Sequence, residues 1–140
     1  MARACLPPCH LIAQFFATQR AEGPGYLDVA VYMRSVDLIL GLPSDVLLYA
    51  GLLRAMCHAT HGLYKPGRIH FFLGDTHVYD SHTEQFLAEQ YPAPSRDLPR
   101  YAWRAPRSVE DLAVFDTFDP AWMDPIDYQY SKDLKYDLHV

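Results

Sequence analysis

The sequence lacks three features that would each define a class of protein. It has only three cysteines, an odd number that excludes a disulfide framework and favours a reducing compartment. No apolar run reaches membrane-spanning length, and the first residues lack the cationic start and long apolar stretch of a signal peptide. The formal net charge of -5 argues against a general nucleic-acid binder but allows a local cationic pocket for one phosphate. We therefore expect a cytoplasmic protein with no membrane or nucleic-acid partner.

The composition is that of a globular domain with a core. Among 140 residues, 50% are apolar and 21% are charged, which is typical of a chain that folds as one unit. No internal repeat or low-complexity linker divides the sequence. We therefore treat residues 1–140 as a single domain.

Hydrophobic patterning predicts two strands and a long helix in the first half of the chain. Apolar residues from Leu11 to Thr18 predict a strand, and residues 26–35 alternate apolar and polar side chains as a second strand that forms a hairpin with the first. Residues 43–61 have the length and composition of a mostly buried helix, with Gly62 as its C-terminal stop. A Pro-Gly turn is then predicted before a short strand through residues 71–72.

The second half of the sequence is less regular. Ser81 and Glu84 have the spacing of a capping box for a short helix that runs towards Tyr91. The prolines from Pro92 onward exclude a long helix and predict a surface excursion, whereas the aromatic and acidic C-terminal stretch is expected to pack. The elements together predict an α+β fold, a mixed sheet backed by helices.

Cys9 is the first candidate for chemistry. Two prolines precede it, and their rigid backbone would hold a thiolate in a defined direction, as a nucleophile requires. A buried structural cysteine is the alternative, because free cysteine is among the most buried residue types. Zinc binding by Cys5, Cys9 and His10 is a weaker reading, since the spacing fits poorly and no fourth ligand is near. The residues alone leave these readings open, and we predict no metal site.

Two further clusters carry polar groups at the ends of predicted strands. Arg34 and Ser35 can hold a phosphate through charge-assisted hydrogen bonds, with Asp37 close by; an ordinary solvated face is the alternative. His77 and Tyr79 lie two residues apart, so they project on the same side of a strand, and both can bind a sugar hydroxyl. The alternative is that both are satisfied within the fold.

In this order and spacing, the clusters resemble the C-terminal half of the thymidylate synthase and pyrimidine-nucleotide hydroxymethylase family. The segments LPPCH, YMRSVDLILGLPSD and KPGRIHFFLGDTHVY carry the resemblance, and EDLAVFDTFDP resembles a later strand, so the similarity extends from Leu6 to about Pro120. The resemblance implies that Cys9 attacks C6 of a pyrimidine nucleotide and makes C5 nucleophilic. C5 would take a one-carbon unit from the cofactor methylenetetrahydrofolate. The exocyclic methylene would then accept hydride, giving a methyl group, or water, giving a hydroxymethyl group.

The resemblance also implies a role for each of the other residues. Arg34 and Ser35 would hold the substrate phosphate. Asp37 would lie between nucleotide and folate and so contact both. His77 and Tyr79 would bind the deoxyribose hydroxyl.

One departure from the family pattern concerns the base. Where the synthases have the asparagine of GLPFN, this chain has Asp45 in GLPSD. A carboxylate accepts from an exocyclic amine and, when protonated, can donate to cytosine N3. Asp45 therefore resembles the residue of the phage dCMP hydroxymethylases, as does Met33, and favours dCMP over dUMP and a phage source. The alternatives are dUMP methylation and a structural role for Asp45 as a helix N-terminal acid.

The second departure is the position of the nucleophile, which lies near mid-chain in the family but is residue 9 here. The upstream half would supply a proton-handling glutamate, folate-stacking aromatics and further phosphate-binding arginines, some of them across a homodimer interface; Arg3 is too close to Cys9 to replace them. The ending YDLHV also differs from the small apolar terminus of the synthases. We therefore expect a homodimer or pairing with a missing N-terminal half. The alternative is a non-catalytic remnant or interaction subunit with an apolar patch.

Overall fold

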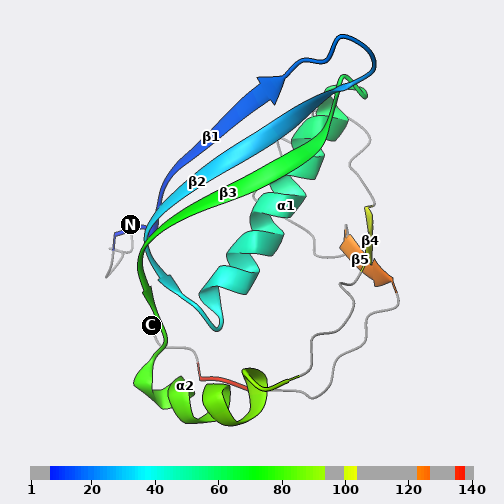
Figure 1. Cartoon of the computed structure of the whole chain (residues 1–140). Coiled ribbons are helices and arrows are strands. Elements are labelled where there is room, and N and C mark those ends of the chain that lie inside the picture. Colours follow the sequence, from blue (N-terminus) through cyan, green and yellow to red (C-terminus); the bar gives the residue numbers. More distant parts are fainter. Residues whose placement is uncertain (1–6, 94–99, 104–122, 127–134, 138–140) are drawn as a thin grey trace, which may run out of the picture.

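The computed structural model describes residues 7–93, 100–103, 123–126 and 135–137. Their elements follow in the order β1 (His10–Thr18), β2 (Gly25–Asp37), α1 (Gly41–Ala59), β3 (Tyr64–His77), α2 (Asp80–Gln85), the π-helical segment η1 (Phe86–Gln90), β4 (Arg100–Trp103) and β5 (Met123–Ile126) (Figure 1). Arg3, Cys5 and the stretch EDLAVFDTFDP lie outside the described residues, as does most of the predicted surface excursion.

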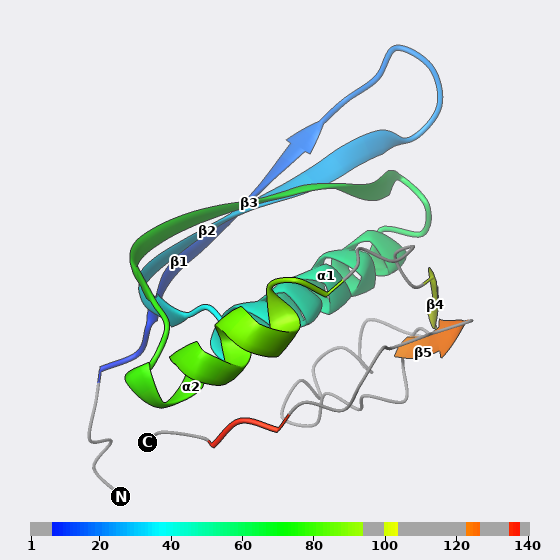
Figure 2. The same cartoon turned by 60° about the horizontal axis from the view of Figure 1, so that its bottom comes forward.

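The main sheet has three strands in the order β1-β2-β3, and β4 pairs with β5 separately. β1 runs antiparallel to β2, which confirms the predicted hairpin, whereas β3 runs parallel to β2. A parallel pair needs a crossover connection, and α1 provides it by lying across one face of the sheet (Figure 2). The mixed sheet backed by helices confirms the predicted α+β class.

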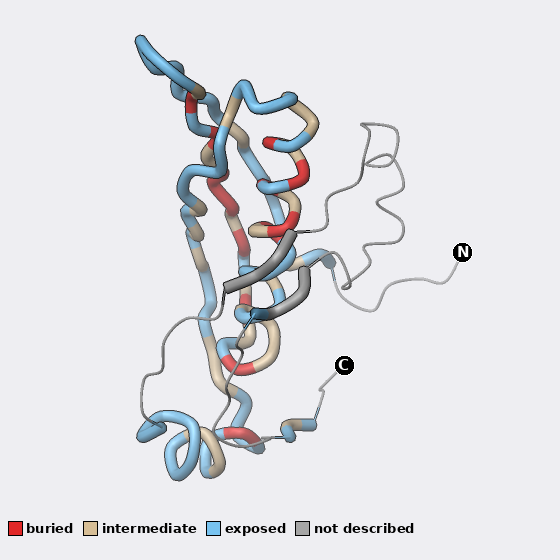
Figure 3. Tube along the Cα trace, turned by 90° about the vertical axis from the view of Figure 1, so that its right-hand side faces the viewer, coloured by how far each residue is buried: buried red, intermediate tan, exposed pale blue. Residues whose placement is uncertain are grey.

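The core lies between this covered face and α1. The alternating apolar residues of β2 are all buried there, as their spacing predicts, and Figure 3 shows the buried positions concentrated along β2 and the facing side of the helix. They pack against Tyr49, Leu53 and Cys57 of α1. The β2 residues of this cluster are Leu27, Val29, Val31 and Met33.

The opposite face of the sheet carries apolar side chains that no described element covers. Ile12 is 57% exposed and Phe72 is 51% exposed. Tyr32 stacks on Phe72 with the ring centroids 4.6 Å apart. An apolar sheet face of this kind is typical of an interaction surface.

The helix α1 differs from its prediction in its bounds and in its burial. It begins at Gly41, two residues earlier than predicted, because a proline is tolerated in the first turn, where N–H groups have no intrahelical acceptor. It also ends two residues earlier than predicted, at Ala59. Gly62 follows the helix with φ 88°, in agreement with its role as the stop. The prediction of a mostly buried helix was wrong, because only one side meets the sheet and the side that includes Leu47 and Leu48 is exposed.

The predicted Pro-Gly turn was also wrong, because Pro66 and Gly67 lie inside β3, a single strand of 14 residues. Two residues of β3, Gly67 and Arg68, oppose Asp28 alone where the pairing register with β2 shifts, so they form a bulge. The Arg68 N–H donates to Asp28 Oδ1 there, and a Cβ on Gly67 would lie 2.0 Å from the same oxygen. Long-range strand pairing therefore overrides the local preference for a turn.

The predicted capping box does not form. α2 begins at Asp80 with Tyr79 as its N-cap, and no side chain caps it. The expectation that the C-terminal stretch packs is confirmed for residues 135–137: His82 donates from Nε2 to the Asp137 carbonyl at 2.8 Å, and the Tyr136 hydroxyl donates to Gln90 at 2.8 Å.

Candidate active site

A pocket of about 580 Å³ opens where β1, β2 and β3 meet the N-terminal end of α1. Every residue predicted for the site from sequence lines it, although these residues come from separate segments of the chain. They are Cys9, Arg34, Ser35, Asp37, Asp45, His77 and Tyr79.

Arg34 anchors the loop that carries Cys9. Its guanidinium donates from Nε to the Pro8 carbonyl at 3.1 Å and from Nη2 to the Pro7 carbonyl at 2.6 Å, while its backbone N–H donates to the Cys9 carbonyl at 2.9 Å. Among the described residues, the guanidinium makes no other hydrogen bond, so it keeps further N–H donors.

The two cysteines of the described residues have different environments. Cys9 is half-buried at the wall of the pocket, whereas Cys57 is buried in the core between α1 and the sheet. Burial raises the pKa of the Cys57 thiol, and the charge of Arg54 opposes this rise. A structural role thus fits Cys57, and access to a ligand fits Cys9.

Asp75 links two predicted site residues. Ser35 Oγ donates to Asp75 Oδ2 at 3.4 Å, and His77 Nδ1 donates to the same oxygen at 3.1 Å. The ring of Tyr79 meets His77 edge-on at 5.2 Å. Sequence reasoning missed Asp75, although its position two residues before His77 on one strand was a usable signal.

Asp37 is held by the turn between β2 and α1. Its Oδ1 accepts from the Ile39 N–H at 2.9 Å and its Oδ2 from the Leu40 N–H at 3.2 Å. This arrangement fixes the carboxylate at the wall of the pocket as a hydrogen-bond acceptor.

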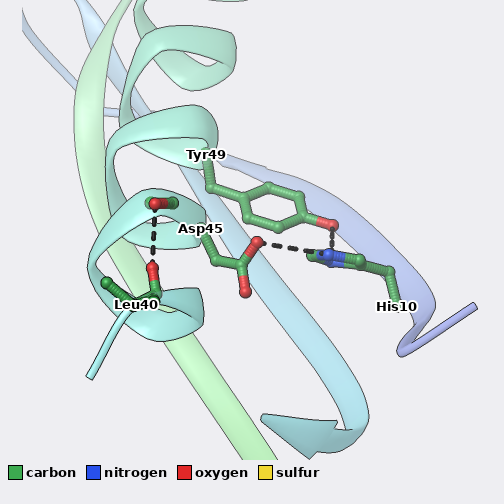
Figure 4. A network of polar contacts seen from close by, with 5 residues as sticks. His10, Leu40, Asp45 and Tyr49 are labelled. Atoms are coloured by element: carbon green, nitrogen blue, oxygen red, sulfur yellow. Dashed lines mark hydrogen bonds and ion pairs between the residues drawn. The ribbon is translucent and has the colours of Figure 1, made fainter. Parts of the chain in front are cut away.

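Asp45 belongs to a network with His10 and Tyr49 (Figure 4). His10 Nε2 lies 3.2 Å from Asp45 Oδ1, and His10 Nδ1 lies 3.1 Å from the Tyr49 hydroxyl. Burial raises the pKa of the Asp45 carboxyl, whereas the charge of His10 and its hydrogen bond oppose this rise. Burial and the charge of Asp45 raise the pKa of Tyr49.

This network changes the interpretation of Asp45. Because α1 begins at Gly41, its first turn contains no acidic residue, so the role of a helix N-terminal acid does not fit. Sequence reasoning assigned no role in the nucleotide site to His10 or Tyr49. The available signals were that His10 follows Cys9 and that Tyr49 lies four residues after Asp45, on the same side of the helix.

Within the described ranges, no group of three or more histidine, cysteine, aspartate or glutamate side chains could hold a metal ion. In the same part of the chain, no helix has both the length and the apolar character to span a bilayer.

The chain is similar to thymidylate synthases in sequence. The enzyme of Bordetella parapertussis is 34% identical over 126 residues, which cover 87% of this chain and 35% of the relative. The bifunctional dihydrofolate reductase-thymidylate synthase of Leishmania amazonensis is 35% identical over 140 residues, which cover 99% of this chain and 24% of the relative.

Solved structures give the same result. Thermostable thymidylate synthase A from Bacillus subtilis matches with a TM-score of 0.75 and 27% identity, over 95% of this chain and 43% of the other. Thymidylate synthase from T4 phage matches with a TM-score of 0.75 and 29% identity, over 96% and 47%. This chain thus spans less than half the length of these four relatives. A family model described as "Thymidylate synthase" matches residues 1–140, and the chain belongs to the thymidylate synthase family.

Proposed function

We propose that this chain carries the nucleophile and the nucleotide-reading residues of a pyrimidine deoxynucleotide C5 one-carbon transferase. The observation that carries the proposal is the pocket itself, since residues chosen from three separate motifs line one cavity with Cys9 in its wall. A volume of about 580 Å³ is within the range of small-molecule sites.

The proposed chemistry begins with the Cys9 thiolate. As the Sγ–C6 bond forms, the electron pair of the C5=C6 bond moves towards C5, which becomes the nucleophile. Methylenetetrahydrofolate, when bound, supplies the one-carbon unit. Loss of the C5 proton releases tetrahydrofolate from the one-carbon unit and leaves an exocyclic methylene on C5. Water or a hydride then adds to this methylene, and the Cys9 thiolate leaves C6 as the C5=C6 bond re-forms. The proton acceptor is expected from the upstream half of the protein.

The other pocket residues bind and orient the ligands in this proposal. Arg34 and Ser35 hold the phosphate, because the guanidinium has donors left and a hydroxyl can rotate. His77 and Tyr79 bind the sugar hydroxyl. Asp37 fits the folate because both of its oxygens are fixed as acceptors by backbone N–H groups, and a pterin presents N–H donors.

Asp45 favours cytosine, so our first candidate is dCMP hydroxymethylation of the kind catalysed by the phage enzymes that this residue resembles. A carboxylate accepts from the 4-amino group of cytosine but faces a second acceptor at O4 of uracil. The second candidate is dUMP methylation, which the names of the matched relatives favour.

The face of the sheet opposite α1, here called the open face, supports a homodimer in the proposed assembly. Ile12, Phe16 and Phe72 are exposed on this face, and such a patch favours association with a second copy. The upstream half would complete the proton-handling and folate-binding groups, and we infer a cytoplasmic location. The competing reading is a non-catalytic remnant or interaction subunit that keeps the same fold.

The first experiment is to measure tritium release from C5-labelled dCMP and dUMP in the presence of methylenetetrahydrofolate. We expect release from dCMP, and we expect Cys9→Ser to lower it by several powers of ten because a hydroxyl is a much weaker nucleophile. The matched control is Cys57→Ala, which removes a buried thiol outside the pocket and should retain release.

Each other outcome has a defined meaning. Release that prefers dUMP would contradict the assignment of Asp45 to cytosine and favour the second candidate. Tritium release that persists in Cys9→Ser would show that Cys9 is not the nucleophile. If neither nucleotide loses tritium, the active-enzyme reading fails for this chain alone, and the assay is repeated with the upstream half added.

A further inference from the structure

The hydroxyl of Tyr49 forms a hydrogen bond whose direction can be deduced. The Tyr49 side chain comes from the middle of α1, packs edge-on against Phe71 and is only 7% exposed. Its hydroxyl lies 3.1 Å from His10 Nδ1, which is its one hydrogen-bonding partner among the described residues. A buried hydroxyl proton without an acceptor costs free energy. Tyr49 therefore donates, and Nδ1 of His10 accepts.

This direction determines the tautomer of His10. An imidazole nitrogen that accepts a hydrogen bond carries no proton, so the ring proton lies on Nε2. Nε2 is 3.2 Å from Asp45 Oδ1 and donates to it. In the opposite tautomer, Nδ1 would donate to Tyr49 and leave the hydroxyl proton without an acceptor, while Nε2 would require a protonated Asp45. Tyr49 thus disfavours the state in which Asp45 is a hydrogen-bond donor.

We propose that Tyr49 is a positioning residue that sets the base preference of the pocket, by holding His10 in the tautomer that keeps Asp45 an acceptor. This inference rests on the proposed nucleotide-binding function and deepens it. Tyr49 does not line the pocket, so it acts through His10 and not by contact with the nucleotide. The carboxylate then meets the 4-amino group of cytosine as an acceptor and rejects O4 of uracil.

Other charged and titratable groups line the pocket together with His10. Among the charged and titratable side chains of this pocket, Arg34 and Asp37 come from β2 and His77 comes from β3. Arg34 is bonded to the loop before His10 and His77 to Asp75. Within the described residues, Asp45 and Tyr49 alone bond to the His10 ring.

The first test needs no nucleotide. In the ¹⁵N-labelled 140-residue chain at neutral pH, the ring nitrogen shifts of His10 report which nitrogen carries the proton. We expect the ring proton on Nε2 and none on Nδ1 in the wild type, and loss of this preference in Tyr49→Phe, which removes only the hydroxyl. The matched control is Tyr32→Phe, which removes a hydroxyl on the open face of the sheet and should leave the His10 signal unchanged.

The second test uses dCMP and dUMP as competing ligands. We expect Tyr49→Phe to lower the preference for dCMP by about tenfold, as for the loss of one charge-assisted hydrogen bond, whereas Tyr32→Phe should leave it unchanged. An unchanged preference in Tyr49→Phe overturns the positioning role even if the tautomer shifts.

The remaining outcomes separate this inference from the proposed function. A wild-type His10 that carries its proton on Nδ1, or on both nitrogens, overturns the inference whether or not the variant folds. If the wild type shows the expected tautomer but binds neither nucleotide, the proposed function fails for this chain alone and the specificity role fails with it, while the hydrogen-bond direction stands.

Discussion

The two sides of the pocket hold their polar groups in different ways. On the phosphate side, which we define as Arg34 and Ser35, the side chains bond to loop carbonyls and to Asp75, whose side chain is 74% exposed. On the base side, which we define as His10, Asp45 and Tyr49, the side chains bond to one another. The side chain of Asp45 there is only 16% exposed.

This difference matches two kinds of recognition. Exposed hydrogen bonds are weakened by water and rearrange easily, so the phosphate side can bind an anion by charge without a fixed geometry. Buried hydrogen bonds are directional, and an unmatched partner among them is costly. The phosphate side therefore suits affinity, whereas the base side suits discrimination between bases. Variants on each side should separate these effects.

The largest effect is expected on the phosphate side, from Arg34→Ala. The substitution removes both guanidinium bonds to the Cys9 loop as well as a cation for the phosphate. Because small displacements of a reacting group are costly, we expect C5 tritium release to fall by about a hundredfold. The effect on the loop is measured separately as the rate of Cys9 alkylation by iodoacetamide without nucleotide, with Cys9→Ser as background.

Arg54→Ala is the matched control for this prediction. Arg54 is an exposed arginine of α1 that does not line the pocket, so both rates should stay at the wild-type level. An Arg34→Ala variant with normal Cys9 alkylation but weaker nucleotide binding would show that Arg34 contacts the phosphate only and does not position the loop.

A smaller effect is expected on the base side, from Asp45→Asn. An amide can donate to O4 of uracil, which a carboxylate cannot, so we expect the ratio of dCMP to dUMP turnover to fall by about tenfold or more. The ratio is measured by tritium release with the two nucleotides in competition. Glu22→Gln, the same change at an exposed loop position, should leave the ratio unaltered. If the ratio of dCMP to dUMP turnover is unaltered in Asp45→Asn, Asp45 does not determine the base preference.

Local patterns in the sequence predict much of the fold. The alternation along residues 26–35 identifies β2 and its buried face correctly, because one side of this strand must be apolar wherever a helix covers it. The bulge at Gly67 and Arg68 could not be predicted, since it depends on pairing with β2. β4 and β5 were missed because each is four residues long and gives almost no periodic signal.

The candidate site, like the fold, could be predicted from the sequence only in part. Residues such as Cys9 and Arg34 stand in motifs, so their order along the chain was enough to select them, and the fold brings them to one pocket. The contact between His10 and Tyr49 joins β1 to the middle of α1. It depends on how the helix packs on the sheet, which no local pattern encodes.

The smallest expected effect is on stability, and it concerns the buried carboxyl of the base side. Because burial raises the pKa of Asp45 above its ordinary value of 3.8, the folded state binds a proton more readily than the unfolded state. The stability contribution of this group is therefore fully present below pH 3.8 and is lost as pH rises towards its folded pKa. Asp45→Asn should then increase the free energy of unfolding relative to wild type at neutral pH, by less than either effect above, and the difference should shrink at acidic pH.

Urea titrations of wild type and Asp45→Asn from acidic to neutral pH measure this difference in the free energy of unfolding, with Glu22→Gln as the control that should show no such trend. A difference that is constant with pH would mean that the interactions with His10 fully offset the free-energy cost of burying the Asp45 carboxylate.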